Sequence, residues 1–249
     1  MTAARLGAVL TFAIAALASR AEGLQPCVVA IDVGHSESQP GAVSARGVGE
    51  HVFNHNVGRR LLDDVHARGL GGSFIVEAPG GTRSLAERTK AAERRGATFF
   101  ISIHHDSVQP VYLSTWQHDG VERRYSDRFS GFSLFVSREG RHAAASLALA
   151  RAIGARLLDA AFQPSLHHAE KIAGEGRDLV DRRRGVYAFD DLVVLKTATM
   201  AAVLLECGII VNRDEELRLL DRAHQTRLVS AVATGIAERC AAREASPTR

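Results

Sequence analysis

Short apolar runs alternate with segments of helical periodicity along most of the chain. The apolar runs are four to six residues long and rich in Val, Ile, Leu and Phe, a pattern typical of buried β-strands. We therefore predict strands at residues 28–31, 73–76, 98–103, 132–136 and 200–205.

Between these runs, apolar residues recur at helical spacing. In residues 50–68, Val57, Leu61 and Val65 share one helix face, and Gly69 follows as a stop signal. Further helices are predicted at residues 84–96, 143–158, 214–220 and 225–239. Strands that alternate with helices predict an α/β fold, in which helices cover both faces of a mostly parallel sheet. Ligands of such sheets gather at the carboxyl ends of the strands.

The N-terminal segment follows a different pattern. Arg5 precedes a continuous apolar stretch at residues 6–18, and small residues follow at 16–21. This order predicts a secretory signal peptide at residues 1–23, with a buried N-terminal helix as the alternative. The apolar stretch is short for a bilayer span, so no stable membrane anchor is expected. We predict an exported protein, periplasmic or secreted, with one domain at residues 24–243 and a disordered tail at 244–249.

The amino-acid composition excludes some classes of function. The 249 residues are 46% hydrophobic and 24% charged, as in ordinary globular proteins. Only 6% are aromatic and the net charge is +3, so neither a stacking platform nor a basic arm for nucleic acid is predicted. The three cysteines leave at least one thiol unpaired, and the sequence does not say which pair forms a bridge. We expect Cys27 and Cys207 to be small buried packing residues.

Four polar residues stand where the predicted elements would bring them together. His35, His104 and Glu206 follow the strands at 28–31, 98–103 and 200–205, and Glu50 opens the first helix. Two imidazoles and one carboxylate are a known catalytic zinc set with an open fourth position. Such a site suits amide hydrolysis, because zinc lowers the pKa of water from about 15.7 to about 7. A carboxylate that does not bind the metal, here Glu206, would then carry the proton.

Other interpretations of these residues remain open at this point. Each histidine alone fits a structural role, Glu50 fits a favourable partner of the helix dipole, and Glu206 fits a salt-bridged core residue. Rival ligands are His51, His55, His105 and the pair His167 and His168. Successive strand residues point to opposite faces, so His104 and His105 are not expected to serve one metal. His55 lies about 500° around the helix from Glu50, which also argues against it.

Several motifs, in order along the chain, resemble a known family. They are Ile31-Asp32-Val33-Gly34-His35, Gly41-Ala42, Gly49-Glu50, Ser84-Leu85 with Arg88, Ile101-Ser102-Ile103-His104, Val194-Leu195-Lys196, Ala202-Val203-Leu204-Leu205-Glu206 and Asn212. The series is similar to the zinc-dependent N-acetylmuramoyl-L-alanine amidases and extends from about residue 28 to residue 238.

The resemblance implies an activity and a site. Enzymes of this family hydrolyse the amide bond between the lactyl group of N-acetylmuramic acid and L-alanine of the peptidoglycan stem peptide. The resemblance places one Zn²⁺ on His35, Glu50 and His104 and the catalytic acid/base on Glu206. It also implies a single domain with a six-stranded sheet. A protein activator is left open as a partner, and a monomer is expected.

Some positions depart from the family pattern. Val33 and Ser36 replace a common proline and glycine, and His105-Asp106 replaces a small residue followed by Asn or Asp. We expect His105 at the rim of the cleft, a rim or substrate loop at 107–130, and a lid rather than a blocking helix at 161–191. The rival functions are a zinc amidohydrolase or peptidase for another cell-wall amide, and a wall-binding protein with a degenerate site.

Overall fold

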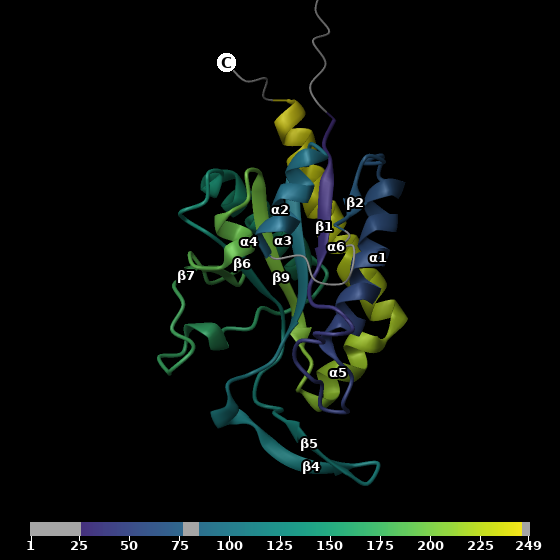
Figure 1. The fold of residues 1–249 in the computed structure, drawn as a ribbon, viewed down its shortest axis with the longest axis vertical. Helices are drawn as coiled ribbons and strands as arrows, with labels where there is room; N and C mark the ends of the chain where they lie inside the picture. Colours follow the sequence, from purple (N-terminus) through teal and green to yellow (C-terminus); the bar gives the residue numbers. More distant parts are fainter. Residues whose placement is uncertain (1–25, 77–84, 246–249) are drawn as a thin grey trace, which may run out of the picture.

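The computed structural model describes residues 26–76 and 85–245. The predicted signal peptide and the last four residues of the predicted tail lie outside these ranges. A seven-stranded sheet crosses the molecule (Figure 1). Its order is β2 (Phe74–Ile75), β1 (Val29–Val33), β3 (Phe99–Asp106), β9 (Ala201–Ile209), β6 (Ser133–Val136), β8 (Val186–Ala188) and β7 (Leu179–Asp181).

The sheet is mixed. Neighbouring strands are parallel in the pairs β2–β1, β1–β3, β3–β9 and β6–β8, and antiparallel in the pairs β9–β6 and β8–β7. This confirms the predicted α/β class with a mostly parallel sheet. The expected number of six strands was wrong, because the sheet has seven. The strands β7 and β8 are each only three residues long, which is too short for an alternation of apolar and polar residues to be detected in the sequence.

Helices cover both faces of the sheet, as predicted. On one face, α1 (Glu50–Ala67), α3 (Ala143–Asp159) and α6 (Arg222–Glu244) enclose a core that takes the odd-numbered residues of β1 and β3. On the other face, α2 (Leu85–Arg94) and α4 (Val193–Lys196) cover Ala30, Phe100 and Leu204. The period of two along each strand therefore decides which face receives each side chain.

The central strands are longer than predicted. β3 continues through Asp106 and β9 through Ile209, so His104 and Glu206 lie within strands and not after them. A residue with a carboxylate or imidazole side chain can still belong to a strand, because only its main chain makes the hydrogen bonds between strands. The helices α5 (Arg213–Leu220) and α6 follow close to their predicted places, and α6 extends to Glu244, the first residue of the predicted tail.

The segment predicted as a loop at 107–130 is structured. It contains a short 3₁₀ helix (Pro110–Tyr112) and an antiparallel hairpin, β4 (Ser114–His118) and β5 (Val121–Tyr125). The hairpin extends beyond the carboxyl ends of β1 and β3, at the bottom of Figure 1. Its polar composition concealed it, because one of its faces is exposed and the other is only half-buried.

A disulfide joins Cys27, just before β1, to Cys240 near the end of α6. The prediction that Cys27 is only a packing residue was therefore wrong, although its side chain is buried. Cys207 is buried, as predicted, and it is the cysteine whose thiol stays free. Within the described ranges, none of the helices combines the length and apolar character that crossing a membrane requires.

Candidate functional site

Three side chains converge where β1 ends and α1 begins. His35 follows β1 across Gly34 and has a left-handed backbone, with φ of 64°. That conformation is uncommon for a residue with a side chain and often marks a functional position. Glu50 is the first residue of α1, and His104 lies on β3 beside the end of β1. We call His35, Glu50 and His104 the Glu50 cluster.

The carboxylate of Glu50 lies between the two imidazoles. Nε2 of His35 is 3.1 Å from its Oε2, and Nδ1 of His104 is 3.0 Å from its Oε1. One ligand atom from each residue lies within 4.8 Å of the others, which is close enough for one metal ion to contact all three. The side chain of His35 is 34% exposed and that of His104 is 19% exposed, so both imidazoles are partly exposed.

Further hydrogen bonds fix the orientation of Glu50. Its Oε2 accepts from the backbone amide of Ala42, and its Oε1 accepts from the side-chain amide of Asn54 and from the backbone amide of His105. Burial opposes ionisation, but the hydrogen bonds from His104, His35 and Asn54 outweigh it and hold the pKa of Glu50 well below its usual range. The carboxylate is therefore ionised and oriented before any ligand arrives.

The donor set and the surrounding backbone fit zinc. Two imidazoles and a carboxylate are a common catalytic zinc set. Gly41 has φ of 75°, and a Cβ there would come within 2.4 Å of Oε2 of Glu50 and 2.6 Å of the His35 ring. A Cβ on Gly34 would come within 2.4 Å of the His104 ring. These two glycines leave the space that the three ligands occupy against the backbone.

Glu206 lies beside the Glu50 cluster. It is paired in register with His104 across β3 and β9, so both side chains point to the face covered by α2 and α4. Both line a cleft of about 340 Å³. Oε2 of Glu206 is buried and has no hydrogen-bond partner among the described residues. Burial, with the nearby carboxylates of Asp106 and Glu50, raises the pKa of Glu206 well above its usual range. A cation in the Glu50 cluster would oppose that rise.

A buried ion pair supports the cluster from below. Asp32 accepts a hydrogen bond from Arg88 at 2.8 Å and another from Ser102 at 2.7 Å. Arg88 also donates to the carbonyl of Val33 at 3.0 Å. These contacts connect α2, β1 and β3 directly beneath the turn that carries His35.

The family described as N-acetylmuramoyl-L-alanine amidase matches residues 29–238. The chain belongs to this family. The resemblance inferred from the motifs is thereby confirmed. The match covers α1, which carries Glu50, the strands β3 and β9, which carry His104 and Glu206, and His35 after β1.

Individual relatives agree with this assignment. The probable N-acetylmuramoyl-L-alanine amidase AmiB of Haemophilus influenzae is 25% identical over 245 residues, which cover 85% of this chain and 51% of that protein. The chain thus spans about half the length of this relative. The catalytic domain of CwlV, an N-acetylmuramoyl-L-alanine amidase from Bacillus (Paenibacillus) polymyxa, is 25% identical with a TM-score of 0.60, covering 85% of this chain and 97% of that one.

A third comparison shows the fold alone. The amidase Ami1 of Mycobacterium smegmatis is 19% identical, with a TM-score of 0.66 over 87% of this chain and 97% of that one. The α/β architecture is therefore shared at low sequence identity.

Three of the histidines considered as alternative ligands lie outside the Glu50 cluster, namely His51, His55 and His105. His51 and His55 line a shallow pocket beside His35. His105 points to the opposite face from His104, as the strand period predicts, and its Nδ1 lies 2.7 Å from Oδ1 of Asn54. The expectation of His105 at the cleft rim was wrong, because its side chain is buried. Burial lowers the pKa of His105 to about 3, so it is neutral.

Sequence reasoning missed two features of the site. Asn54 lies one helical turn after Glu50, so the spacing could have identified it as a partner. His167 and His168 gather with Asp106 in a second group of potential metal ligands. Asp106 is two residues after His104 on β3, which places it on the same side of the strand, but no local signal indicates that residues 165–175 fold against it.

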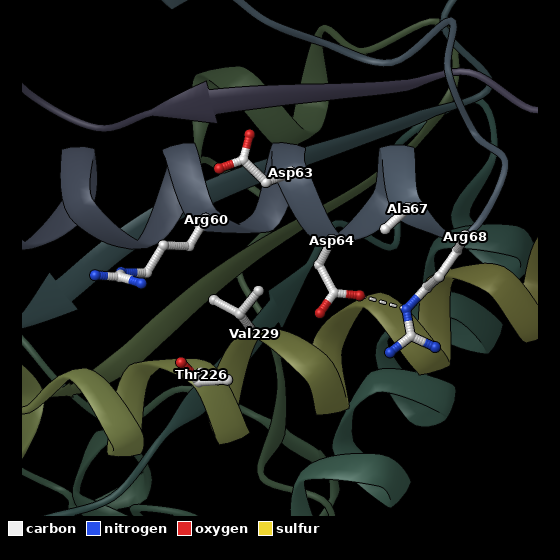
Figure 2. A pocket seen from close by; sticks show the side chains of 7 residues that line it. All are labelled: Arg60, Asp63, Asp64, Ala67, Arg68, Thr226 and Val229. Carbon is white, nitrogen blue, oxygen red and sulfur yellow. Dashed lines mark hydrogen bonds and ion pairs between the residues drawn. The ribbon is translucent and has the colours of Figure 1, made fainter.

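Another pocket, of about 460 Å³, lies between α1 and α6 (Figure 2). Its charged side chains are Arg60, Asp63, Asp64 and Arg68, and Asp64 forms an ion pair with Arg68. It contains neither histidine nor any of the family motif residues. The motif residues His104 and Glu206 line the other cleft, at the ends of β3 and β9.

Proposed function

We propose that this protein hydrolyses the amide bond between the lactyl group of N-acetylmuramic acid and L-alanine of the peptidoglycan stem peptide. The observation that carries the proposal is the juxtaposition of the Glu50 cluster with Glu206, because His104 of that cluster is in register with Glu206 across β3 and β9 and lines one cleft with it. Membership of the amidase family supports the choice of substrate.

His35, Glu50 and His104 would hold one zinc ion. When bound, the ion supplies a Lewis acid that polarises the scissile carbonyl and lowers the pKa of water toward 7, from about 15.7 in bulk. The hydrogen bonds from Ala42, Asn54 and the His105 amide keep the Glu50 carboxylate in place, so the ligand set is oriented in advance.

Glu206 would carry the proton. Its unpartnered Oε2 is free to accept a proton from the attacking water, whose oxygen forms a bond to the carbonyl carbon. The same carboxyl group then donates that proton to the leaving nitrogen as the carbon–nitrogen bond breaks. The products are a free lactyl carboxylate on the glycan and a stem peptide with an L-alanine amino terminus.

Digestion of purified sacculi tests this proposal. We expect mass spectrometry to find free stem peptides and intact glycan strands after incubation with the protein, and neither product after treatment with a chelator. Glu206→Gln should lower turnover by about 10²- to 10⁴-fold, the usual contribution of a general acid–base group, without loss of bound zinc.

Three results would contradict the proposal or a part of it. Cleavage at a different wall amide would assign the site to another zinc amidohydrolase or peptidase. Pelleting with sacculi without zinc binding or hydrolysis would assign it to wall binding alone. Full turnover by Glu206→Ala would remove Glu206 from its proposed role.

We also propose that residues 1–23 direct export to the periplasm or the medium and that 24–243 form the catalytic domain. A disulfide between Cys27 and Cys240 supports an oxidising compartment. Fractionation of expressing cells, with N-terminal sequencing of the mature chain, tests both points. Activity of the purified chain alone on sacculi would show that it needs no protein activator.

A further inference from the structure

A second group of potential metal ligands lies next to the Glu50 cluster but shares no residue with it. Asp106 is the last residue of β3, and His167 and His168 open a short 3₁₀ helix (His167–Ala169). We call these three residues the Asp106 cluster. Asp106 and His168 line the same cleft as His104 and Glu206.

Both imidazoles approach one oxygen of Asp106. Nε2 of His168 is 2.8 Å from Oδ2, and Nε2 of His167 is 3.2 Å from the same atom. The ligand atoms all lie within 4.8 Å of one another. The side chains of His167, His168 and Asp106 are 1%, 9% and 15% exposed, so the group is largely withdrawn from water.

An outer set of hydrogen bonds orients each member. Nδ1 of His168 lies 2.8 Å from Oε2 of Glu175, and Nδ1 of His167 lies 2.8 Å from the hydroxyl of Ser165. Oδ1 of Asp106 accepts from the backbone amide of Ser107 at 2.8 Å. In metal sites the histidine ligands are held in this way, with one ring nitrogen on the metal and the other on a carboxylate, carbonyl or hydroxyl group.

Among the described residues, one nitrogen of this group makes an ion-pair contact but no hydrogen bond. Nε2 of His167 is buried, yet among the described residues it makes no hydrogen bond of acceptable geometry. Oδ2 of Asp106 already makes a hydrogen bond with Nε2 of His168. Buried polar atoms without partners are rare in native proteins, and they call for a ligand. A cation at the point where both Nε2 atoms and Oδ2 converge would give all three a partner.

We propose that Asp106, His167 and His168 bind a second divalent cation, Zn²⁺, separate from the ion of the Glu50 cluster. Two imidazoles and one carboxylate are a donor set that zinc favours, and three protein ligands leave one position for water or for an anionic group of a ligand in the cleft. The ion connects the segment 165–175 to the end of β3.

Metal counting on single variants tests the inference independently of catalysis. Purified chains are loaded with zinc, passed through gel filtration and measured by plasma mass spectrometry. We expect two zinc ions per wild-type chain, one in His35→Ala and one in Asp106→Asn, which preserves side-chain volume. His142→Ala serves as the matched control, because His142 is exposed and belongs to neither cluster, and it should retain two.

Cobalt provides a second readout. In the His35→Ala background, added Co²⁺ should produce a visible absorption spectrum that disappears when Asp106→Asn is added, with circular dichroism verifying that both chains are folded. One zinc ion in the wild type and none in His35→Ala would overturn the second site. Two bound ions without amidase activity would refute the proposed function and leave this inference standing, and amidase activity with one ion would do the reverse.

Discussion

The Glu50 cluster and the Asp106 cluster contain the same ligand types, but they are held in opposite ways. In the Glu50 cluster, the protein fixes the carboxylate with three further hydrogen bonds, and the two imidazoles are partly exposed. In the Asp106 cluster, the protein fixes both imidazoles, and they are almost wholly buried.

The difference shows how one donor set can serve two purposes. A site that acts on a polymer must leave its ligands accessible, so rigidity has to come from the group behind them, which here is Glu50. A site that joins a segment to a strand has no such requirement and can be enclosed. The first arrangement suits turnover, and the second suits a firmly held ion.

The largest expected effect comes from breaking the Glu50 cluster itself. His35→Ala should remove its zinc and lower turnover by more than the roughly 10²- to 10⁴-fold that loss of an acid–base group costs. Thermal stability in the presence of chelator should change little, because His35 is partly exposed. The control is His55→Ala, because His55 is exposed and lines a pocket with His35 without belonging to the Glu50 cluster, and this variant should retain near-wild-type turnover. An active His35→Ala variant would remove this residue from the ligand set.

The next effect comes from the ion pair beneath the Glu50 cluster. Arg88→Met leaves the Asp32 carboxylate buried without its partner, which should lower the free energy of unfolding by about 3–5 kcal/mol. Urea denaturation of the chelator-treated protein measures it. Adding Asp32→Leu to Arg88→Met should recover much of the loss, since no buried charge then remains. Equal stability of wild type and Arg88→Met would show that the pair does not support this region.

A smaller effect is expected from Asn54, which holds Glu50 in place without belonging to the Glu50 cluster. Asn54→Ala removes one hydrogen bond to Glu50, one to the carbonyl of Gly34 and the contact with Nδ1 of His105. Loss of such outer partners typically weakens metal binding by about 10- to 100-fold. Competition with a chromophoric chelator gives the zinc affinity, measured in the Asp106→Asn background so that only the Glu50 cluster contributes. Unchanged affinity would mean that the remaining contacts already fix the carboxylate.

The smallest expected effect lies in the Asp106 cluster. Ser165→Ala deletes the hydroxyl that orients His167, a contribution of about 0.5–1.5 kcal/mol for a single hydrogen bond. His168 remains held by Glu175, so zinc affinity measured in the His35→Ala background should fall by less than in Asn54→Ala. A larger loss from Ser165→Ala than from Asn54→Ala would reverse the comparison between the two clusters.

Much of the fold and of the Glu50 cluster could be predicted from local patterns. Apolar runs located β1, β3, β6 and β9, and the period of two along β3 separated His104 from His105. The convergence of His35, Glu50 and His104 follows once β1 and β3 are taken as parallel neighbours, and Glu206 on β9 lies beside His104. The ends of β3 and β9 were misjudged, because polar residues at a cleft interrupt the apolar pattern without ending the strand.

The sequence by itself determined which residues form the central strands and which face each side chain takes, because those properties depend on neighbours a few positions away. Only the tertiary structure decided that Cys27 pairs with Cys240, that β7 and β8 extend the sheet, and that His167 and His168 meet Asp106. These contacts join segments 60 or more residues apart or rest on very short strands. Such pairings depend on the packing of the whole chain. The local periodicity of the sequence carries no information about that packing.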